Sequence, residues 1–137
     1  MPNETVKKLQ VSFPLPPTLN EIIKEARDNR YKSAKSKREW TNYVKECCKT
    51  IKIKFPGKVW IDVCFHTRTR MNDPDNLMAG LKPILDGLVK SSIIADDSIS
   101  IIQSPVVQRF KTTKGKNSVV LTFSNKPIYQ LTEINYD

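Results

Sequence analysis

The segment 59–66 constrains the fold of this chain most, because its side chains alternate between two kinds along its whole length. One set is strongly apolar and the other is mixed: Val59, Ile61, Val63 and Phe65 alternate with Trp60, Asp62, Cys64 and His66. A period of two predicts a β-strand with one strongly apolar face. We therefore expect this strand to turn that face toward the core.

Further strand and helix patterns surround this segment. Residues 6–13, 99–107 and 118–123 are strand-like, and a basic turn is predicted at 111–116. Apolar residues at helical spacing begin after Glu39 and comprise Trp40, Tyr43, Val44, Cys47, Cys48 and Ile51. This stripe predicts a helix with Cys47 and Cys48 at or beside the core. The basic residues 31–38 fit either a loop or the first turn of that helix.

A second helix is predicted after Asp75. Its apolar stripe comprises Leu77, Leu81, Ile84, Leu85, Leu88 and Val89. Gly80 and Pro83 predict a kink or break between them, because proline cannot donate a backbone hydrogen bond and glycine weakens a helix. The patterns together predict an α/β (α+β) fold, a small mixed β-sheet of about four strands flanked by helices. We expect one domain over residues 1–137, with a core at 6–124 and a tail at 125–137.

Composition excludes several classes of function. No apolar run has the length of a membrane span and the N-terminus lacks the apolar core of a signal peptide, so we expect a cytoplasmic protein without a membrane partner. Three cysteines without metal-binding spacing argue against both a disulfide framework and a zinc site. His66 is the only histidine, which removes Ser-His-Asp and Cys-His catalysis.

The chain is basic, and its charges are unevenly placed. It has 23 basic and 14 acidic side chains, a net charge of +9. Residues 24–58 hold twelve basic against four acidic side chains, whereas residues 68–97 hold four against five. A basic segment beside an acidic one suits a metal-dependent enzyme that acts on nucleic acid. A solvated, lysine-rich surface is the alternative.

Five of the eight aspartates fall within 25 residues: Asp73, Asp75, Asp86, Asp96 and Asp97. Pro74 forces Asp73 toward extended geometry, so Asp73 and Asp75 point to one side. The predicted helix presents Lys82 and Asp86 on the side away from its apolar stripe. Carboxylates in this number suit Mg²⁺ or Mn²⁺.

Other interpretations of these aspartates exist. A calcium loop of the EF-hand type is excluded, because Leu77 and Met78 stand where an oxygen ligand and a glycine are required. A purely structural interpretation makes Asp73 and Asp75 helix caps and 96–97 a surface turn. We prefer a metal site, because clustered like charges destabilise a fold unless a positive charge lies among them.

Three motifs carry a resemblance to a known family. They are Arg70-x-x-Asp73-Pro74-Asp75-Asn76, Lys82-x-x-x-Asp86-Gly87-Leu88 and Asp96-Asp97-Ser98, with a proline-rich turn at 14–20 and a basic turn at 112–115. Over residues 6–123 the chain resembles the RusA family of Holliday-junction resolvases. The spacing from Asn76 to Lys82 is three residues longer than in a shorter version of the motif. Three residues are almost one helical turn, so Lys82 would lie on a similar side of the helix as the lysine of the shorter motif.

The resemblance implies a homodimeric, Mg²⁺-dependent endodeoxyribonuclease, with Mn²⁺ as an alternative cation. It would resolve four-way DNA junctions by paired symmetric nicks, in recombination and repair in the bacterial nucleoid or for a prophage or phage. It implies Asp73, Asp75 and Asp97 as catalytic metal ligands, Lys82 as the catalytic lysine, and Asp86 and Asp96 as further acidic positions. We expect the following cations to grip DNA phosphates: Lys32, Lys35, Lys37, Arg38, Arg68 and Arg70.

Two other functions stay open at this point. One is a nuclease selective for other branched DNA, such as flaps or forks. The other is a DNA-binding protein without catalysis that keeps the same fold.

Overall fold

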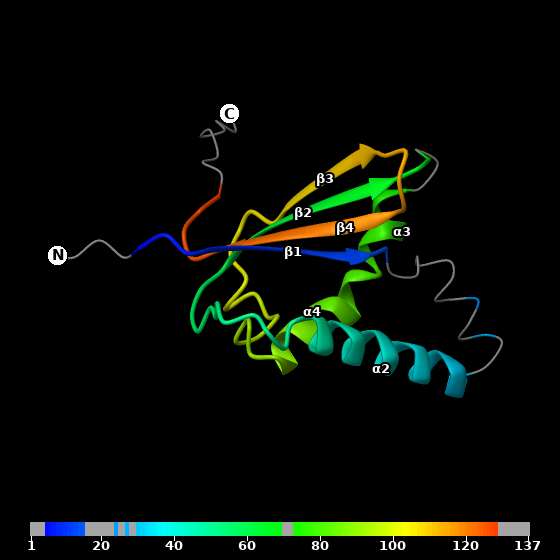
Figure 1. Cartoon of the computed structure of the whole chain (residues 1–137), viewed down its shortest axis with the longest axis horizontal. Helices are drawn as coiled ribbons and strands as arrows, with labels where there is room; N and C mark the ends of the chain where they lie inside the picture. The colour runs from blue at the N-terminus through cyan, green and yellow to red at the C-terminus, as the bar shows by residue number, and fades with distance from the viewer. Residues whose placement is uncertain (1–4, 16–23, 25–26, 28–29, 70–72, 129–137) are drawn as a thin grey trace, which may run out of the picture.

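The computed structural model describes residues 5–15, 24, 27, 30–69 and 73–128 (Figure 1). The strands are β1 (Lys8–Pro14), β2 (Trp60–Thr67), β3 (Val107–Thr112) and β4 (Ser118–Ser124). The helices are α2 (Arg30–Cys47), α3 (Pro74–Met78) and α4 (Leu81–Lys90). The predicted α+β fold with a small mixed sheet flanked by helices is confirmed. Of the proline-rich turn expected at 14–20, the part 16–20 lies outside the described residues.

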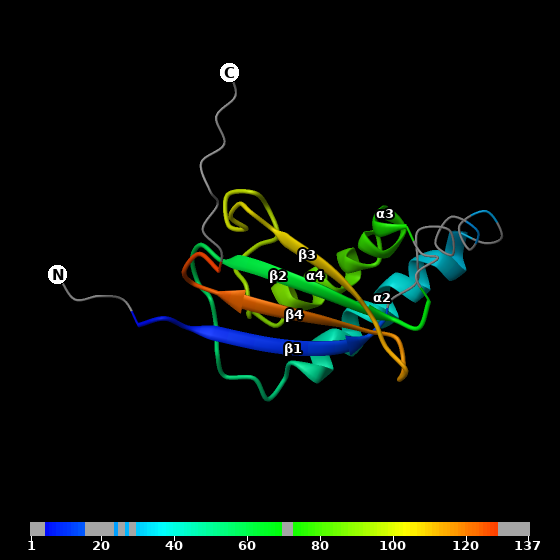
Figure 2. The same ribbon diagram turned by 90° about the horizontal axis from the view of Figure 1, so that it is seen from above.

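The four strands form one sheet in the order β1-β4-β2-β3 (Figure 2). β4 runs antiparallel to both β1 and β2, and β3 runs parallel to β2. The register places Val11, Leu121 and Val63 side by side, and does the same for Phe13, Val119 and Phe65. These six side chains are buried and form the sheet's side of the core. The apolar alternation in 59–66 therefore predicted the core face correctly.

Helices α2 and α4 cover that face of the sheet (Figure 1). α4 contributes the buried residues Leu81, Ile84 and Leu88, as its apolar stripe predicted. Gly87 faces α2 at close range: a Cβ added there would lie 2.6 Å from Cβ of Val44 and 2.9 Å from the backbone oxygen of Thr41. Only a glycine allows the two helices to approach this closely.

The position of α2 differs from the prediction in two ways. The helix begins at Arg30, so the basic segment 31–38 is helical. Among the side chains of α2 that the structure describes, Thr41 and Val44 are buried, as is Cys48 just beyond the helix, whereas Cys47 is exposed. The prediction that Cys47 lies at or beside the core is therefore wrong. Tyr43 of the same predicted stripe also lies outside the core, with its ring packed edge-on against Trp40 at 5.7 Å between centroids, so the buried side of α2 is narrower than the stripe.

The predicted interruption of the second helix is confirmed, slightly earlier than expected. α3 ends at Met78 and α4 begins at Leu81, with Ala79 and Gly80 in a turn between them. Pro83 thus falls in the first turn of α4. Backbone N–H groups in the first turn have no acceptor within the helix, so the missing N–H of proline costs no hydrogen bond there.

The segment 99–106 is not a strand, contrary to the prediction. Its only sheet-like contact among the described residues is an isolated bridge between Ile102 and Val59, and Ile99 is 95% exposed. Both Ile101 and Ile102 donate backbone hydrogen bonds to the oxygen of Ser98, which closes a turn. β3 begins only at Val107 and extends through Lys111 and Thr112, so the predicted basic turn is shorter than expected.

The outer face of β2 is also largely buried. Asp62 is 4% exposed, and Arg109 of β3 binds its carboxylate with Nε at 3.3 Å and Nη2 at 3.1 Å. Cys64 beside it is buried too. The sequence pattern placed these residues on the face away from the core, where the Arg109 side chain of the neighbouring strand lies against Asp62.

Among the described residues, no helix has both the length and the apolar character that crossing a membrane requires.

Candidate active site

Asp73 and Asp75 stand at the start of α3, directly after the segment that leaves β2. Asp73 is the N-cap residue, with an extended backbone (φ −78°, ψ 144°) as expected before Pro74. Its backbone oxygen accepts hydrogen bonds from the N–H groups of Asn76 and Leu77. Its side chain makes no capping hydrogen bond, and both carboxylates are exposed. Asp73 thus occupies the N-cap position that the structural interpretation gave it, but its carboxylate does not cap the helix.

Lys82 lies between two carboxylates. Its Nζ is 2.9 Å from Oδ2 of Asp97 and 3.0 Å from Oδ1 of Asp86. Asp86 is one turn further along α4, and Asp97 belongs to the loop after it. Asp96 holds that loop by accepting a 2.8 Å hydrogen bond from the backbone N–H of Asp97. The structure thus brings Lys82, Asp86 and Asp97 together, with Asp96 bracing the turn.

The ionisation of this group follows from its contacts. The pKa of Lys82 is raised, first by its hydrogen bond to Asp97 and next by that to Asp86. The pKa of Asp97 is lowered, mainly by the hydrogen bond from Lys82. Both changes favour the charged forms, so an ammonium and a carboxylate face each other at neutral pH. Because the Lys82 side chain is 67% exposed, the pair contributes about 1 kcal/mol or less to folding.

The expected metal ligands do not form a preformed metal-binding site. Within the described ranges, no group of three or more histidine, cysteine or acidic side chains is placed to hold a metal ion. The carboxylate of Asp97 is bound to Lys82 instead. Mg²⁺ usually takes one or two carboxylates, several waters and oxygens of a substrate phosphate. The exposed carboxylates of Asp73 and Asp75 suit such a site. Asp97 could serve as a ligand only after its hydrogen bond to Lys82 is broken.

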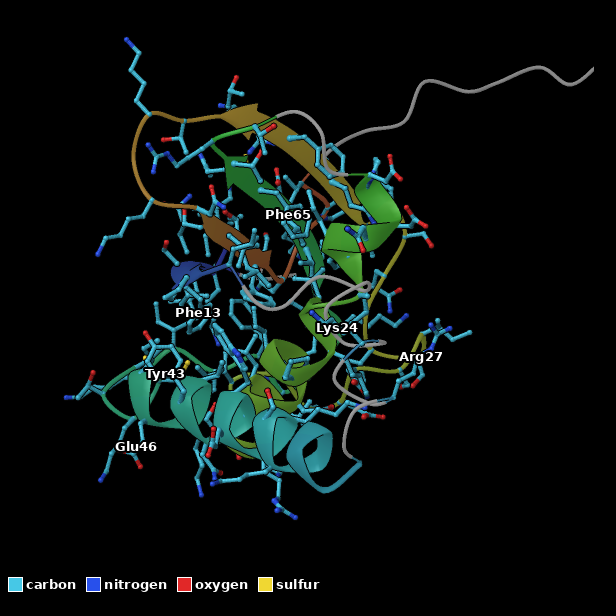
Figure 3. All side chains as sticks on the ribbon, turned by 90° about the vertical axis from the view of Figure 1, so that its right-hand side faces the viewer. Phe13, Lys24, Arg27, Tyr43, Glu46 and Phe65 are labelled. Atoms are coloured by element: carbon cyan, nitrogen blue, oxygen red, sulfur yellow. The ribbon has the colours of Figure 1, made fainter. Side chains whose placement is uncertain are left out.

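Cations gather at the end of the sheet from which α3 begins. β2 and β3 are parallel, so Arg68 and Lys111 lie at the same end, as do Lys114 and Lys116 in the turn before β4. All four are exposed. This end faces the viewer in Figure 3, where Phe65 marks the exit of β2. Two hydrogen bonds tie the segments together, from the N–H of Arg68 to Asn117 and from the N–H of Thr113 to the oxygen of Thr67.

Sequence reasoning identified Arg68 but missed the three lysines. The run of lysines between 111 and 116 is visible in the sequence. Its position at the end of the sheet from which α3 begins depends on the parallel pairing of β2 with β3, which no local pattern predicts.

The cations expected on the basic segment lie in α2. Lys35, Lys37 and Arg38 are exposed, and Lys35 is 3.9 Å from Glu39. Figures 1 and 2 show the first turns of α2 toward the same end of the molecule as α3. Lys32 is in this helix, but its side chain, like the whole of Arg70, lies outside the described part of the chain. His66 is partly buried at the end of β2.

A comparison of the chain with models of protein families gave no match, and neither did a comparison with curated proteins.

Proposed function

We propose that this protein is an Mg²⁺-dependent endodeoxyribonuclease of the RusA type that resolves four-way DNA junctions. The observation that carries the proposal is the grouping of Lys82 with Asp86 and Asp97, a short distance along the chain from two exposed carboxylates at the start of α3. An ammonium among carboxylates beside a basic surface suits the cleavage of a phosphodiester.

In this proposal each side chain has a distinct task. Asp73 and Asp75 would hold Mg²⁺, or Mn²⁺, and Asp97 would be a further ligand once Lys82 turns to the phosphate. Bound Mg²⁺ would lower the pKa of a coordinated water and neutralise charge on the leaving oxygen. Lys82 stabilises the charge that develops on the phosphate. Asp86 retains Lys82 on α4 while Asp97 changes partner.

The cations at this end of the sheet supply the affinity for DNA. Arg68, Lys111, Lys114 and Lys116 are exposed at the end of the sheet from which α3 begins, and the net charge of +9 favours a polyanion. A homodimer would place two such sites on one junction, which paired symmetric nicks require.

The test is cleavage of three synthetic substrates, a four-way junction, a flap and a plain duplex, with and without Mg²⁺. We expect Mg²⁺-dependent cleavage of the junction, which Asp75→Asn abolishes while junction binding is largely kept. Glu46→Gln is the matched control, because it removes an exposed carboxylate of α2.

Three results would contradict the proposal. Cleavage by Asp75→Asn at the wild-type rate would show that Asp75 is not a catalytic metal ligand. Cleavage of the flap but not the junction would favour a nuclease of other branched DNA. Binding without cleavage of any substrate would favour a non-catalytic DNA-binding protein.

A further inference from the structure

Phe110 is a solvent-exposed aromatic side chain beside the candidate active site. It belongs to the edge strand β3 and is 44% exposed. Its ring stacks on the buried ring of Phe65, with 5.6 Å between the centroids and 8° between the planes. One face of the Phe110 ring is thus fixed against the core, which gives the opposite face a defined orientation.

A cavity of about 220 Å³ opens at this ring. Phe110, Lys111 and Thr112 of β3 line it together with Thr69 after β2 and with Pro74 and Leu77 of α3. Pro74 stands between Asp73 and Asp75 in the sequence, so the cavity adjoins the stretch of backbone that carries these two carboxylates. Its lining combines a flat aromatic surface, hydroxyl groups and one ammonium.

This combination fits a nucleotide better than other ligands. A base stacks on an aromatic ring whatever its sequence, hydroxyl groups are partners for its edge, and an ammonium attracts its phosphate. A base inside a duplex is already stacked and paired, so it is not available to such a cavity. An unpaired base is available in single-stranded DNA and at a branch point.

We infer that this cavity binds an unpaired nucleobase of the DNA substrate, stacked on Phe110, with Lys111 beside the adjoining phosphate. The inference rests on the proposed function in one respect, namely that the substrate is DNA. It adds a reason for preferring branched over plain duplex DNA. Phe110 is then a specificity-determining residue and takes no part in the cleavage step.

The test uses the full chain without a divalent cation, so that cleavage plays no part. The probe is a short single-stranded oligonucleotide that carries 2-aminopurine, whose fluorescence falls when the base stacks on an aromatic ring. Binding of a duplex of the same length is measured alongside. The variants are Phe110→Ala, Phe110→Leu and Phe110→Trp.

We expect Phe110→Leu and Phe110→Ala to weaken binding of the single strand by about 5- to 150-fold and to abolish the fluorescence change. Phe110→Trp should keep both, and duplex binding should change little in every variant. Phe110→Leu keeps an apolar side chain against Phe65, so it separates stacking from packing if Phe110→Ala fails to fold.

Wild-type binding and an unchanged fluorescence response in folded Phe110→Leu would overturn the inference. An equal loss of duplex binding would also overturn it, because stacking of an unpaired base cannot explain that loss. These outcomes are distinct from failure of the proposed nuclease, since the folded protein either binds the unpaired base or does not, whether or not it cleaves.

Discussion

Lys82 Nζ lies 2.9 Å from Oδ2 of Asp97, fifteen residues further along the chain. The ammonium is thus bound to one oxygen of this carboxylate. Asp86 binds the same ammonium from within α4. Under the proposed function, Lys82 and a divalent cation would compete for Asp97, and Asp86 would remain a partner for Lys82 when Lys82 leaves Asp97.

Replacement of Lys82 should separate catalysis from binding. We expect Lys82→Ala to lower the single-turnover rate of junction cleavage by about 10²- to 10³-fold, the usual effect of losing one group that stabilises transition-state charge. Junction affinity should change little, because many other cations contact the backbone. Lys90→Ala, which removes an exposed lysine at the end of α4, is the control. A rate for Lys82→Ala equal to that of the control would remove Lys82 from the mechanism.

The contact between Lys82 and Asp97 should make stability depend on pH at both extremes. The pKa of Asp97 is lowered in the folded protein, so its stabilisation is present above the unfolded pKa of about 3.9 and is lost as pH falls through the folded value. The pKa of Lys82 is raised, so its stabilisation is present below about 10.4 and is lost as pH rises through the folded value.

Urea unfolding at several pH values tests this dependence. Near pH 7, Asp97→Asn should lower the free energy of unfolding by about 1 kcal/mol or less, and the difference should vanish in acid. Lys82→Met together with Asp97→Asn should cost less than the sum of the two single changes. Strict additivity would show that the two groups do not interact.

Gly87→Ala should destabilise the protein although alanine is the better helix former. The added Cβ would lie 2.6 Å from Cβ of Val44, and overpacking of this kind costs about 1–3 kcal/mol. Gly57→Ala is the matched control, since a Cβ there meets nothing within 4 Å. Thermal unfolding of both variants gives the comparison, and equal melting temperatures would contradict the close approach of α2 and α4.

Arg109→Met should weaken the sheet by about 1–3 kcal/mol, because it removes charged hydrogen bonds to the buried carboxylate of Asp62. Arg68→Met should leave stability unchanged and weaken DNA binding, since the Arg68 side chain is exposed at the candidate DNA surface. Urea unfolding and junction binding, measured on both variants, check this contrast. The reverse pattern would exchange the roles assigned to the two arginines.

The lysines of the turn before β4 should contribute affinity without sequence preference. We expect Lys114→Ala with Lys116→Ala to weaken junction binding and to reduce the slope of log affinity against log salt by about 2, one for each lost phosphate contact. Titrations at several salt concentrations measure the slope. An unchanged slope would show that DNA does not reach this turn.

Local patterns predicted the parts of the fold that depend on local physics. Alternation fixed the core face of β2, and Gly80 with Pro83 indicated the break before α4. Patterns failed where tertiary contacts determine the structure. Cys47 follows the helical stripe yet is exposed, and 99–106 was predicted as strand-like yet begins with a turn.

The candidate site shows the same division. Aspartates and a lysine at helical spacing indicated which side chains belong to it, and the exposed side of α4 was placed correctly. The pairing of Lys82 with Asp97 and the position of Lys111 depend on how distant segments pack, so they could not be predicted.

The parallel pairing of β2 with β3 requires the chain to return from one end of the sheet to the other between them. That return path is the stretch 68–106, and it contains Asp73, Asp75, Lys82, Asp86, Asp96 and Asp97. Insertions or deletions there would shift the edge strand and the ionisable side chains together.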